Sequence, residues 1–174
     1  MPFTPFHWGP VFLIAVLARK NVDFVAIMVS AVLADIEPIL VLLGVIDGPL
    51  RGFLHSFEGG VIIAFTTTIL VYLLNDYRET FLQFIGFEQV FSLPKTFLGS
   101  TIGAFSHVVL DSAIYGRFNI LYVLEWPNIF YGYISTVQMY VLCIITSLVG
   151  ILLFHKWSSR GLFNIRDDLN EKIV

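Results

Sequence analysis

Long apolar runs separated by short polar turns dominate the chain and predict five transmembrane helices. The predicted ranges are 5–18, 22–46, 53–74, 94–115 and 133–154. Thr4 and Pro5 give the first helix a hydroxyl N-cap followed by proline at its first position. That helix is only about 21 Å long, which is short for a bilayer. Arg19 and Lys20 at its end could snorkel to the interface and allow it to cross.

Three segments depart from this simple pattern. The stretch "YRETFLQFIGFEQVF", within residues 76–95, predicts an interfacial amphipathic helix on the membrane surface. Pro38 predicts a bend within the second helix. Residues 116–128 predict a connection with aromatic side chains at interfacial depth. We therefore expect an all-α integral membrane protein, with residues 1–155 as a single transmembrane helical domain and residues 156–174 as a polar cytoplasmic tail.

Composition supports a membrane protein rather than a soluble one. The 174 residues, enough for one domain, are 57% apolar and only 13% charged, with a mean hydropathy of +0.83, whereas soluble domains are about 25% charged. The net charge of −3 gives no reason to expect a nucleic-acid partner. The N-terminal residues lack a basic region, so no cleaved signal peptide is expected. The single Cys143 lies in an apolar run and is expected to pack there.

The distribution of positive charges predicts the orientation, because cytoplasmic loops carry an excess of Lys and Arg. With five crossings and a cytoplasmic tail, the outer side holds two basic residues, Arg51 and Arg117. The cytoplasmic side then holds eight: Arg19, Lys20, Arg78, Lys95, Lys156, Arg160, Arg166 and Lys172. We therefore predict a multi-pass protein of the cell (inner) membrane, with the N-terminus outside and the C-terminus in the cytoplasm.

Several ionisable residues nevertheless lie in or beside the apolar spans. Such a group costs a few kcal/mol to insert and by default suggests function. The residues are His7, Asp35, Glu37, His55, Glu58, His107 and Asp111. The predicted orientation places five of them in the outer half of one helical bundle: His7, Asp35, His55, His107 and Asp111. Their depths agree, but the pattern does not fix their lateral positions.

The stretch "GSTIGAFSHVVLD" adds lateral information. Gly99, Gly103, His107 and Asp111 are spaced by four and form one stripe on a helix. Glycines at this spacing let a neighbouring helix approach closely, so the stripe should face protein. The histidine and aspartate could bind one metal ion from adjacent turns, with zinc favoured and manganese or iron as alternatives. They could equally form a hydrogen-bonded pair that only packs the bundle.

Other polar residues also have two readings. Glu37 could bond backbone groups freed by the bend at Pro38, and Glu58 could orient His55 or face water. Arg51 could be a solvated loop residue or hold a phosphate. His7 could be structural or solvated. His155 is expected to lie at the cytoplasmic interface.

Four motifs in this order resemble the membrane-bound metal-dependent hydrolases. These are small inner-membrane proteins of bacteria and archaea, distantly similar to zinc-dependent phospholipase C and related nucleases. The resemblance covers roughly residues 3–128. It rests on "TPFHWGP" with His7, "ADIEP" with Asp35, "RGFLHS" with Arg51 and His55, and "SHVVLD" with His107 and Asp111.

The resemblance implies roles for these residues. His55, His107 and Asp111 would ligate the principal metal, and His7 with Asp111 would serve a second. Asp35 would ligate metal or act as base for the attacking water.

The chain also departs from the family. Many members have a histidine where this chain has Leu50, and no histidine follows Asp111 until His155. At most one or two metals are therefore expected.

The sequence thus favours a zinc-dependent hydrolase acting on a phosphoester or phospholipid-like substrate at the outer half of the membrane. A bound metal would activate water, Asp35 would take a proton or position the water, and Arg51 would bind a substrate phosphate. One alternative is a metal- or proton-binding transporter or partner subunit without enzymatic activity. Another is a purely structural membrane protein.

Overall fold

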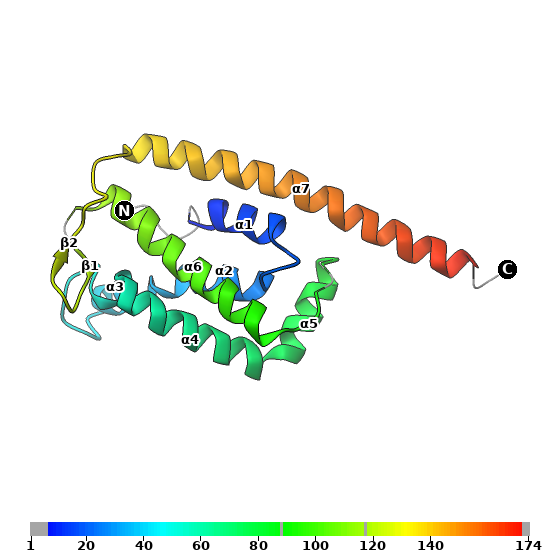
Figure 1. The fold of residues 1–174 in the computed structure, drawn as a ribbon, viewed down its shortest axis with the longest axis horizontal. Helices are drawn as coiled ribbons and strands as arrows, with labels where there is room; N and C mark the ends of the chain where they lie inside the picture. Colours follow the sequence, from blue (N-terminus) through cyan, green and yellow to red (C-terminus); the bar gives the residue numbers. More distant parts are fainter. Residues whose placement is uncertain (1–6, 88, 117, 172–174) are drawn as a thin grey trace.

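Most of the chain is helical, which confirms the all-α class. The computed structural model describes residues 7–87, 89–116 and 118–171, with side chains up to residue 157. The elements are α1 (Trp8–Leu17), α2 (Phe24–Leu33), α3 (Ile36–Leu42), the 3₁₀ turn η2 (Phe53–His55), α4 (Phe57–Leu73), α5 (Asn75–Phe84), α6 (Leu93–Ile114), β1 (Asn119–Leu121), β2 (Trp126–Pro127) and α7 (Thr136–Glu171). In Figure 1, α7 runs along α1, and its last turns extend beyond the other helices.

Local sequence signals explain where several helices begin. The side chain of Asp23 accepts a hydrogen bond from the backbone N–H of Ala26 and caps α2. Ser56 caps α4 in the same way by accepting from Gly59. Pro94 occupies the first turn of α6, where its missing N–H costs nothing. The predicted start at Thr4 and Pro5 lies outside the described residues, and α1 begins at Trp8.

The glycine stripe of α6 packs against α2, as the sequence predicts. A Cβ on Gly99 would meet the backbone of Asp23, and one on Gly103 would collide with Ile27 and Ser30. Four steps further along α6, the ring of His107 bonds the carbonyl of Ala31. Partners on both helices therefore advance by four residues in the same direction, so α2 and α6 run parallel in close contact.

Two other faces complete the bundle. Helix α4 packs against α6 through a buried cluster of Ala34, Ile63 and Ala104. Helix α1 lies against α7, where a Cβ on Gly9 would collide with the carbonyl of Cys143. Cys143 itself is 2% exposed, which confirms that it is buried in the packing between helices.

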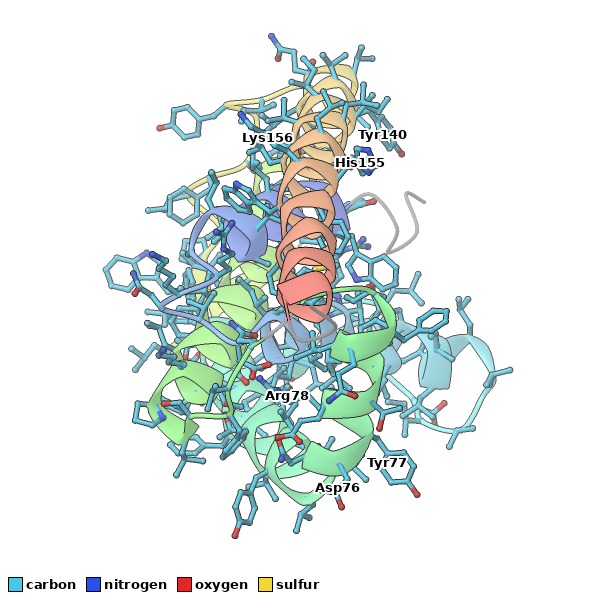
Figure 2. All side chains as sticks on the ribbon, turned by 90° about the vertical axis from the view of Figure 1, so that its right-hand side faces the viewer. Asp76, Tyr77, Arg78, Tyr140, His155 and Lys156 are labelled. Atoms are coloured by element: carbon cyan, nitrogen blue, oxygen red, sulfur yellow. The ribbon has the colours of Figure 1, made fainter. Side chains whose placement is uncertain are left out.

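A buried ion pair holds the far end of α2. Arg78 Nε on α5 lies 2.6 Å from Asp23 Oδ2, and both side chains are 1% exposed. Figure 2 shows Arg78 directed inward, whereas Asp76 and Tyr77 on the same helix point away. The guanidinium of Arg78 therefore compensates a carboxylate that is buried within the bundle.

By length and composition, three helical segments could cross a membrane: Phe24–Leu42, Leu93–Ile114 and Thr136–Trp157. Helices α4 and α5 add a fourth candidate if they count as one span, although an 82° bend separates them. Helix α1 has only 10 residues, too few to span the hydrocarbon core. Apolar helices thus support membrane association, but the predicted five crossings are not confirmed.

The predicted bend in the second helix is a complete break between α2 and α3. Pro38 has no N–H to donate to the carbonyl of Ala34, four residues earlier. The backbone N–H of Glu37 donates to that carbonyl instead, at 3.2 Å. Asp35 lies in the break rather than within a continuous helix.

The connection predicted at residues 116–128 contains a short antiparallel hairpin, β1–β2, over residues 119–127. Helix α7 continues to Glu171, across the predicted boundary at residue 155, and His155 and Lys156 are exposed on it. Arg117 and Lys172 lie outside the described residues, as do the side chains of Arg160 and Arg166.

Candidate metal centre

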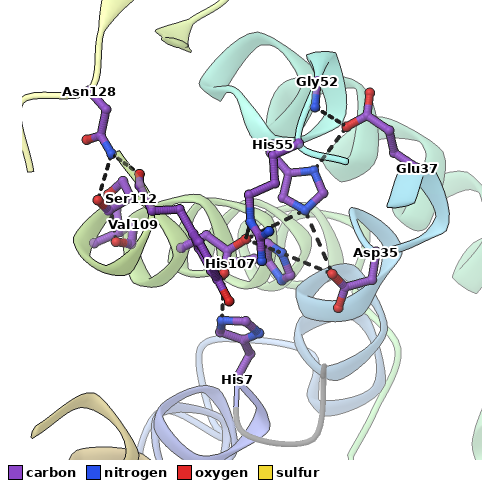
Figure 3. Close-up of polar contacts among 12 residues, drawn as sticks. His7, Asp35, Glu37, Gly52, His55, His107, Val109, Ser112 and Asn128 are labelled. Atoms are coloured by element: carbon purple, nitrogen blue, oxygen red, sulfur yellow. Dashed lines mark hydrogen bonds and ion pairs between the residues drawn. The ribbon is translucent and has the colours of Figure 1, made fainter. Parts of the chain in front are cut away.

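The structure brings all five predicted ligand residues together from four separate parts of the chain. His7 precedes α1, Asp35 lies in the break after α2, and His55 ends η2. His107 and Asp111 come from adjacent turns of α6. Figure 3 shows the three imidazoles and two carboxylates pointing toward one another.

Two histidine rings aim the same nitrogen at the same carboxylates. His55 Nε2 lies 3.8 Å from Asp35 Oδ1 and 3.7 Å from Asp111 Oδ2. His107 Nε2 lies 3.7 Å from Asp35 Oδ1 and 3.9 Å from Asp111 Oδ2. These separations are too long for hydrogen bonds, and each Nε2 is buried without a hydrogen-bond partner among the described residues. They suit atoms that share one cation.

The other nitrogen of each ring is already occupied. His107 Nδ1 lies 2.7 Å from the carbonyl oxygen of Ala31, and His55 Nδ1 lies 3.0 Å from Glu37 Oε2. A carbonyl oxygen accepts only, as does an ionised carboxylate, so in both rings Nδ1 carries the proton. The neutral imidazoles therefore present the lone pair of Nε2 to the cluster. This is the arrangement by which proteins fix metal-binding histidines.

Two overlapping groups of residues could hold a divalent metal ion. One is His55, His107 and Asp111, all fully buried, and the other is His7, Asp35 and His107. Within each group the candidate ligand atoms lie within 4.8 Å of one another. Because His107 belongs to both groups, the arrangement suits one ion, or two ions that share ligands.

His7 and Arg51 contact opposite oxygens of Asp111. His7 Nε2 lies 3.1 Å from Oδ1, yet that oxygen has no hydrogen-bond partner of acceptable geometry among the described residues. Arg51 Nε donates to Oδ2 at 2.6 Å, and its guanidinium stacks on the ring of Tyr115. His7 is 4% exposed, so it is not solvated.

The carboxylate that orients His55 is Glu37, not Glu58. Glu37 also accepts hydrogen bonds from the backbone N–H groups of Gly52 and Leu54, which fixes the segment that carries His55. Glu58 instead accepts from the backbone of Tyr122 and Val123 and holds the β1–β2 hairpin. Sequence spacing favoured Glu58 because it lies one turn after His55, but Ser56 begins a new helix between them.

His55 has an altered acidity in the metal-free protein. Burial alone would lower the pKa of its imidazole. The nearby carboxylate of Asp35, the hydrogen bond to Glu37 and the negative charge of Asp111 together outweigh burial and raise the pKa above its ordinary value.

Arg51 connects the cluster to two surface cavities. One cavity, of about 330 Å³, is lined by Arg51 together with Asn119, Tyr122 and Asn128. The other, of about 450 Å³, is lined by Arg51 with Tyr115 and Tyr131. Both have polar and aromatic walls, so a polar group in either cavity would lie beside a guanidinium that also bonds Asp111.

Two contributors to the site have no signal in the sequence. The carbonyl of Ala31 is one of many backbone groups in an apolar helix, and only the docking of α6 singles it out. Glu37 sits next to Pro38 and was interpreted as a partner for freed backbone groups; it does bond backbone, but that of the η2 segment. A comparison of the chain with family models, with curated proteins and with solved structures finds no match to any of them.

Proposed function

We propose that the protein is a membrane-embedded, metal-dependent hydrolase that acts on a phosphoester-containing lipid. The observation that carries this proposal is the pair of buried Nε2 atoms on His55 and His107, both unpartnered and both aimed at Asp35 and Asp111. A bundle held together only by hydrogen bonds would have no reason to leave these two buried ring nitrogens without partners, each 3.7–3.9 Å from a carboxylate oxygen of Asp35 and of Asp111.

Zinc is the favoured ion, with manganese or iron as alternatives. His55, His107 and Asp111 would offer two imidazole nitrogens and one carboxylate, ligand types that zinc prefers, and His7 would offer a third imidazole. When bound, such an ion supplies Lewis-acid chemistry: it polarises a phosphoryl oxygen and lowers the pKa of water.

The remaining chemistry belongs to the side chains around the cluster. Asp35 is the most accessible carboxylate of the set, with 15% of its side chain exposed, whereas Asp111 is fully buried. Asp35 is therefore the residue that we assign to accept a proton from water. Arg51 holds Asp111 in place through Nε and presents its guanidinium to the two cavities, where it would bind a substrate phosphate.

The family resemblance and the membrane environment support a lipid substrate at the outer half of the inner membrane. In this proposal the N-terminus of the protein lies outside and its C-terminus lies in the cytoplasm. The Tyr122 and Trp126 side chains of the hairpin are exposed beside the Arg51 cavities. Aromatic residues of this kind are enriched at the headgroup level of membranes. A cavity at that level can receive a lipid headgroup without removing the lipid from the bilayer.

A second candidate is a metal- or proton-linked transporter or partner subunit. Buried hydroxyl groups occur on α2, α4 and α6 between the cluster and the Asp23–Arg78 pair: Ser30, Thr67, Thr68, Thr96 and Ser100. Thr68 donates to Ser100 at 3.2 Å, so part of this set is connected. Such groups could relay protons, which a one-sided hydrolase does not need.

Metal content of detergent-purified protein tests the proposal. We expect one or two zinc ions per chain by inductively coupled plasma mass spectrometry, lost in both His107→Ala and Asp111→Ala. His155→Ala, an exposed histidine on α7, is the matched control and should keep its metal. A metal-loaded wild type should then release phosphate or a phosphorylated headgroup from phospholipids, and Asp35→Asn should not. Equal metal content in wild type and both cluster variants would refute the proposal.

A further inference from the structure

A large apolar groove lies between four helices of the bundle. Its volume is about 640 Å³, and side chains from α1, α2, α5 and α7 line it. Helix α2 contributes Val25, Met28, Val29 and Val32, which follow the spacing of a single helix face. Phe12 and Phe154, whose ring centroids are 5.9 Å apart, form the wall on the side of α1 and α7.

The groove is too large to be a packing defect. Protein interiors are close-packed, with few voids larger than a water molecule. Cavities of about 300–1,000 Å³ with apolar walls are typical of ligand sites. Four separate helices build this one, so it is not merely the exposed face of a single helix.

Two residues that line the groove are close in sequence to proposed metal ligands. Trp8 lines it and directly follows His7 in the chain. Val32 lines it near the end of α2 and lies three residues before Asp35. A ligand in the groove would therefore lie near the segments that carry two of the proposed metal ligands.

The chemistry of the walls selects a hydrocarbon occupant. Eleven of the twelve lining residues are apolar, and the hydroxyl of the exception, Ser147, already donates to the carbonyl of Cys143 at 2.7 Å. The wall is therefore almost entirely apolar. Residues Phe24–Leu42 and Thr136–Trp157, which supply two of the walls, are long and apolar enough to lie at the hydrocarbon depth of a bilayer.

We propose that this groove binds one acyl chain of a membrane lipid and brings its phosphoester to the cluster. The groove would then receive the acyl part of the lipid, and the cavities beside Arg51 would receive its polar headgroup. Lipid binding does not depend on the proposed hydrolysis. Selection of long-chain substrates, which would follow from lipid binding, does rest on the proposed hydrolase function.

Lipid retention by metal-free protein tests the groove without turnover. Chelator-treated protein in detergent is incubated with dioleoyl phosphatidylglycerol, exchanged into fresh detergent, and its bound lipid is counted by mass spectrometry. We expect about one retained lipid per chain, and at least fivefold less in Val29→Trp, because the indole fills the groove. Leu148→Trp is the matched control: Leu148 is exposed on α7 outside the groove and should retain lipid like wild type.

Two further measurements separate the possible failures. Val29→Trp should still bind metal, because Val29 is not one of the proposed ligands. Loss of metal would show that the variant is misfolded, and the dependence of wild-type lipid retention on acyl-chain length would then decide the proposal. Dihexanoyl phosphatidylglycerol and glycerol 1-phosphate should fail to displace the dioleoyl lipid. Equal retention in the three proteins, or displacement by glycerol 1-phosphate, would overturn the acyl-chain proposal. An unchanged metal content in His107→Ala would instead overturn the hydrolase proposal, and the acyl-chain proposal for the groove would still stand.

Discussion

His107 Nδ1 lies 2.7 Å from the carbonyl oxygen of Ala31, on the helix that packs against its own. This bond sets the tautomer of the ring and turns Nε2 toward Asp35 and Asp111. It also uses a helical carbonyl at a point of close helix contact, which the glycines at 99 and 103 make possible. The packing of two helices and the preparation of a ligand are thus one feature of the structure.

Glu37→Gln should weaken metal binding about 10- to 100-fold while leaving the fold intact. The amide oxygen can still accept from Gly52, but the NH2 group that replaces the second oxygen cannot accept from Leu54, and the side chain no longer supplies the negative charge that makes His55 a stronger ligand. Competition with a zinc chelator measures the affinity. Glu58→Gln is the control, since Glu58 bonds the hairpin and not His55. Similar affinities for both variants would show that Glu37 has no role in ligand orientation.

Gly103→Ala should destabilise the protein by about 1–3 kcal/mol and reduce its metal content. A methyl group there collides with Ile27 and Ser30, so α2 and α6 must separate. Asp35 follows α2 and His107 is on α6, so separation would pull the ligands apart. Thermal unfolding in detergent and metal analysis measure the two effects. Thr101→Ala, on the same helix but outside the stripe, should change neither; a stable, metal-replete Gly103→Ala would contradict the argument.

Arg78→Met should cost about 3–5 kcal/mol, because it leaves Asp23 buried without a counter-charge. The replacement has similar length and no charge. Lys95→Met, at the exposed start of α6, removes a basic residue from a nearby region and should have little effect on stability. Chemical unfolding of the purified proteins distinguishes them. If both variants unfold alike, the Asp23–Arg78 pair does not stabilise the bundle.

Arg51→Lys should keep the metal but bind phosphate about 10- to 100-fold more weakly. Lysine preserves a positive charge near Asp111 but loses the planar guanidinium that can bond Asp111 and a phosphate together. Calorimetric titration of metal-loaded protein with inorganic phosphate gives the affinity. Arg19→Lys is the control, because Arg19 stacks on Trp157 outside the site. Undiminished phosphate binding would exclude Arg51 as the anion contact.

Metal affinity should rise with pH across the titration of His55. The raised pKa means that the metal-free protein keeps a proton on this imidazole to higher pH than usual, and a metal must displace it. The same shift stabilises the metal-free fold at low pH and is lost as pH rises through the raised pKa. Zinc titrations between about pH 5.5 and 8.5 should show the metal affinity rising with pH. In Glu37→Gln the rise in metal affinity should begin at lower pH, since one cause of the raised pKa of His55 is gone. An unchanged pH profile would contradict this role of Glu37.

The sequence by itself determined the helical class, most helix positions and the identity of the five candidate ligands. Apolar periodicity and turn residues act locally, so α4, α6 and the start of α7 lie close to their predicted ranges. The free-energy cost of placing an ionisable residue in a membrane singles out such residues in apolar spans, whatever their neighbours. The spacing of Gly99, Gly103, His107 and Asp111 indicated a helix face that contacts protein.

Only the tertiary structure decided which of these residues meet and what they do. The contacts of Arg51 with Asp111, of Arg78 with Asp23, and of Glu37 with His55 join positions 60, 55 and 18 residues apart, so no local pattern contains them. The break at Asp35 depends on one carbonyl that Pro38 cannot bond, and the position of α7 beside α1 depends on the packing of the two helices. Ligand geometry is a property of helix docking, and docking is set by complementary surfaces rather than by the periodicity of either helix alone.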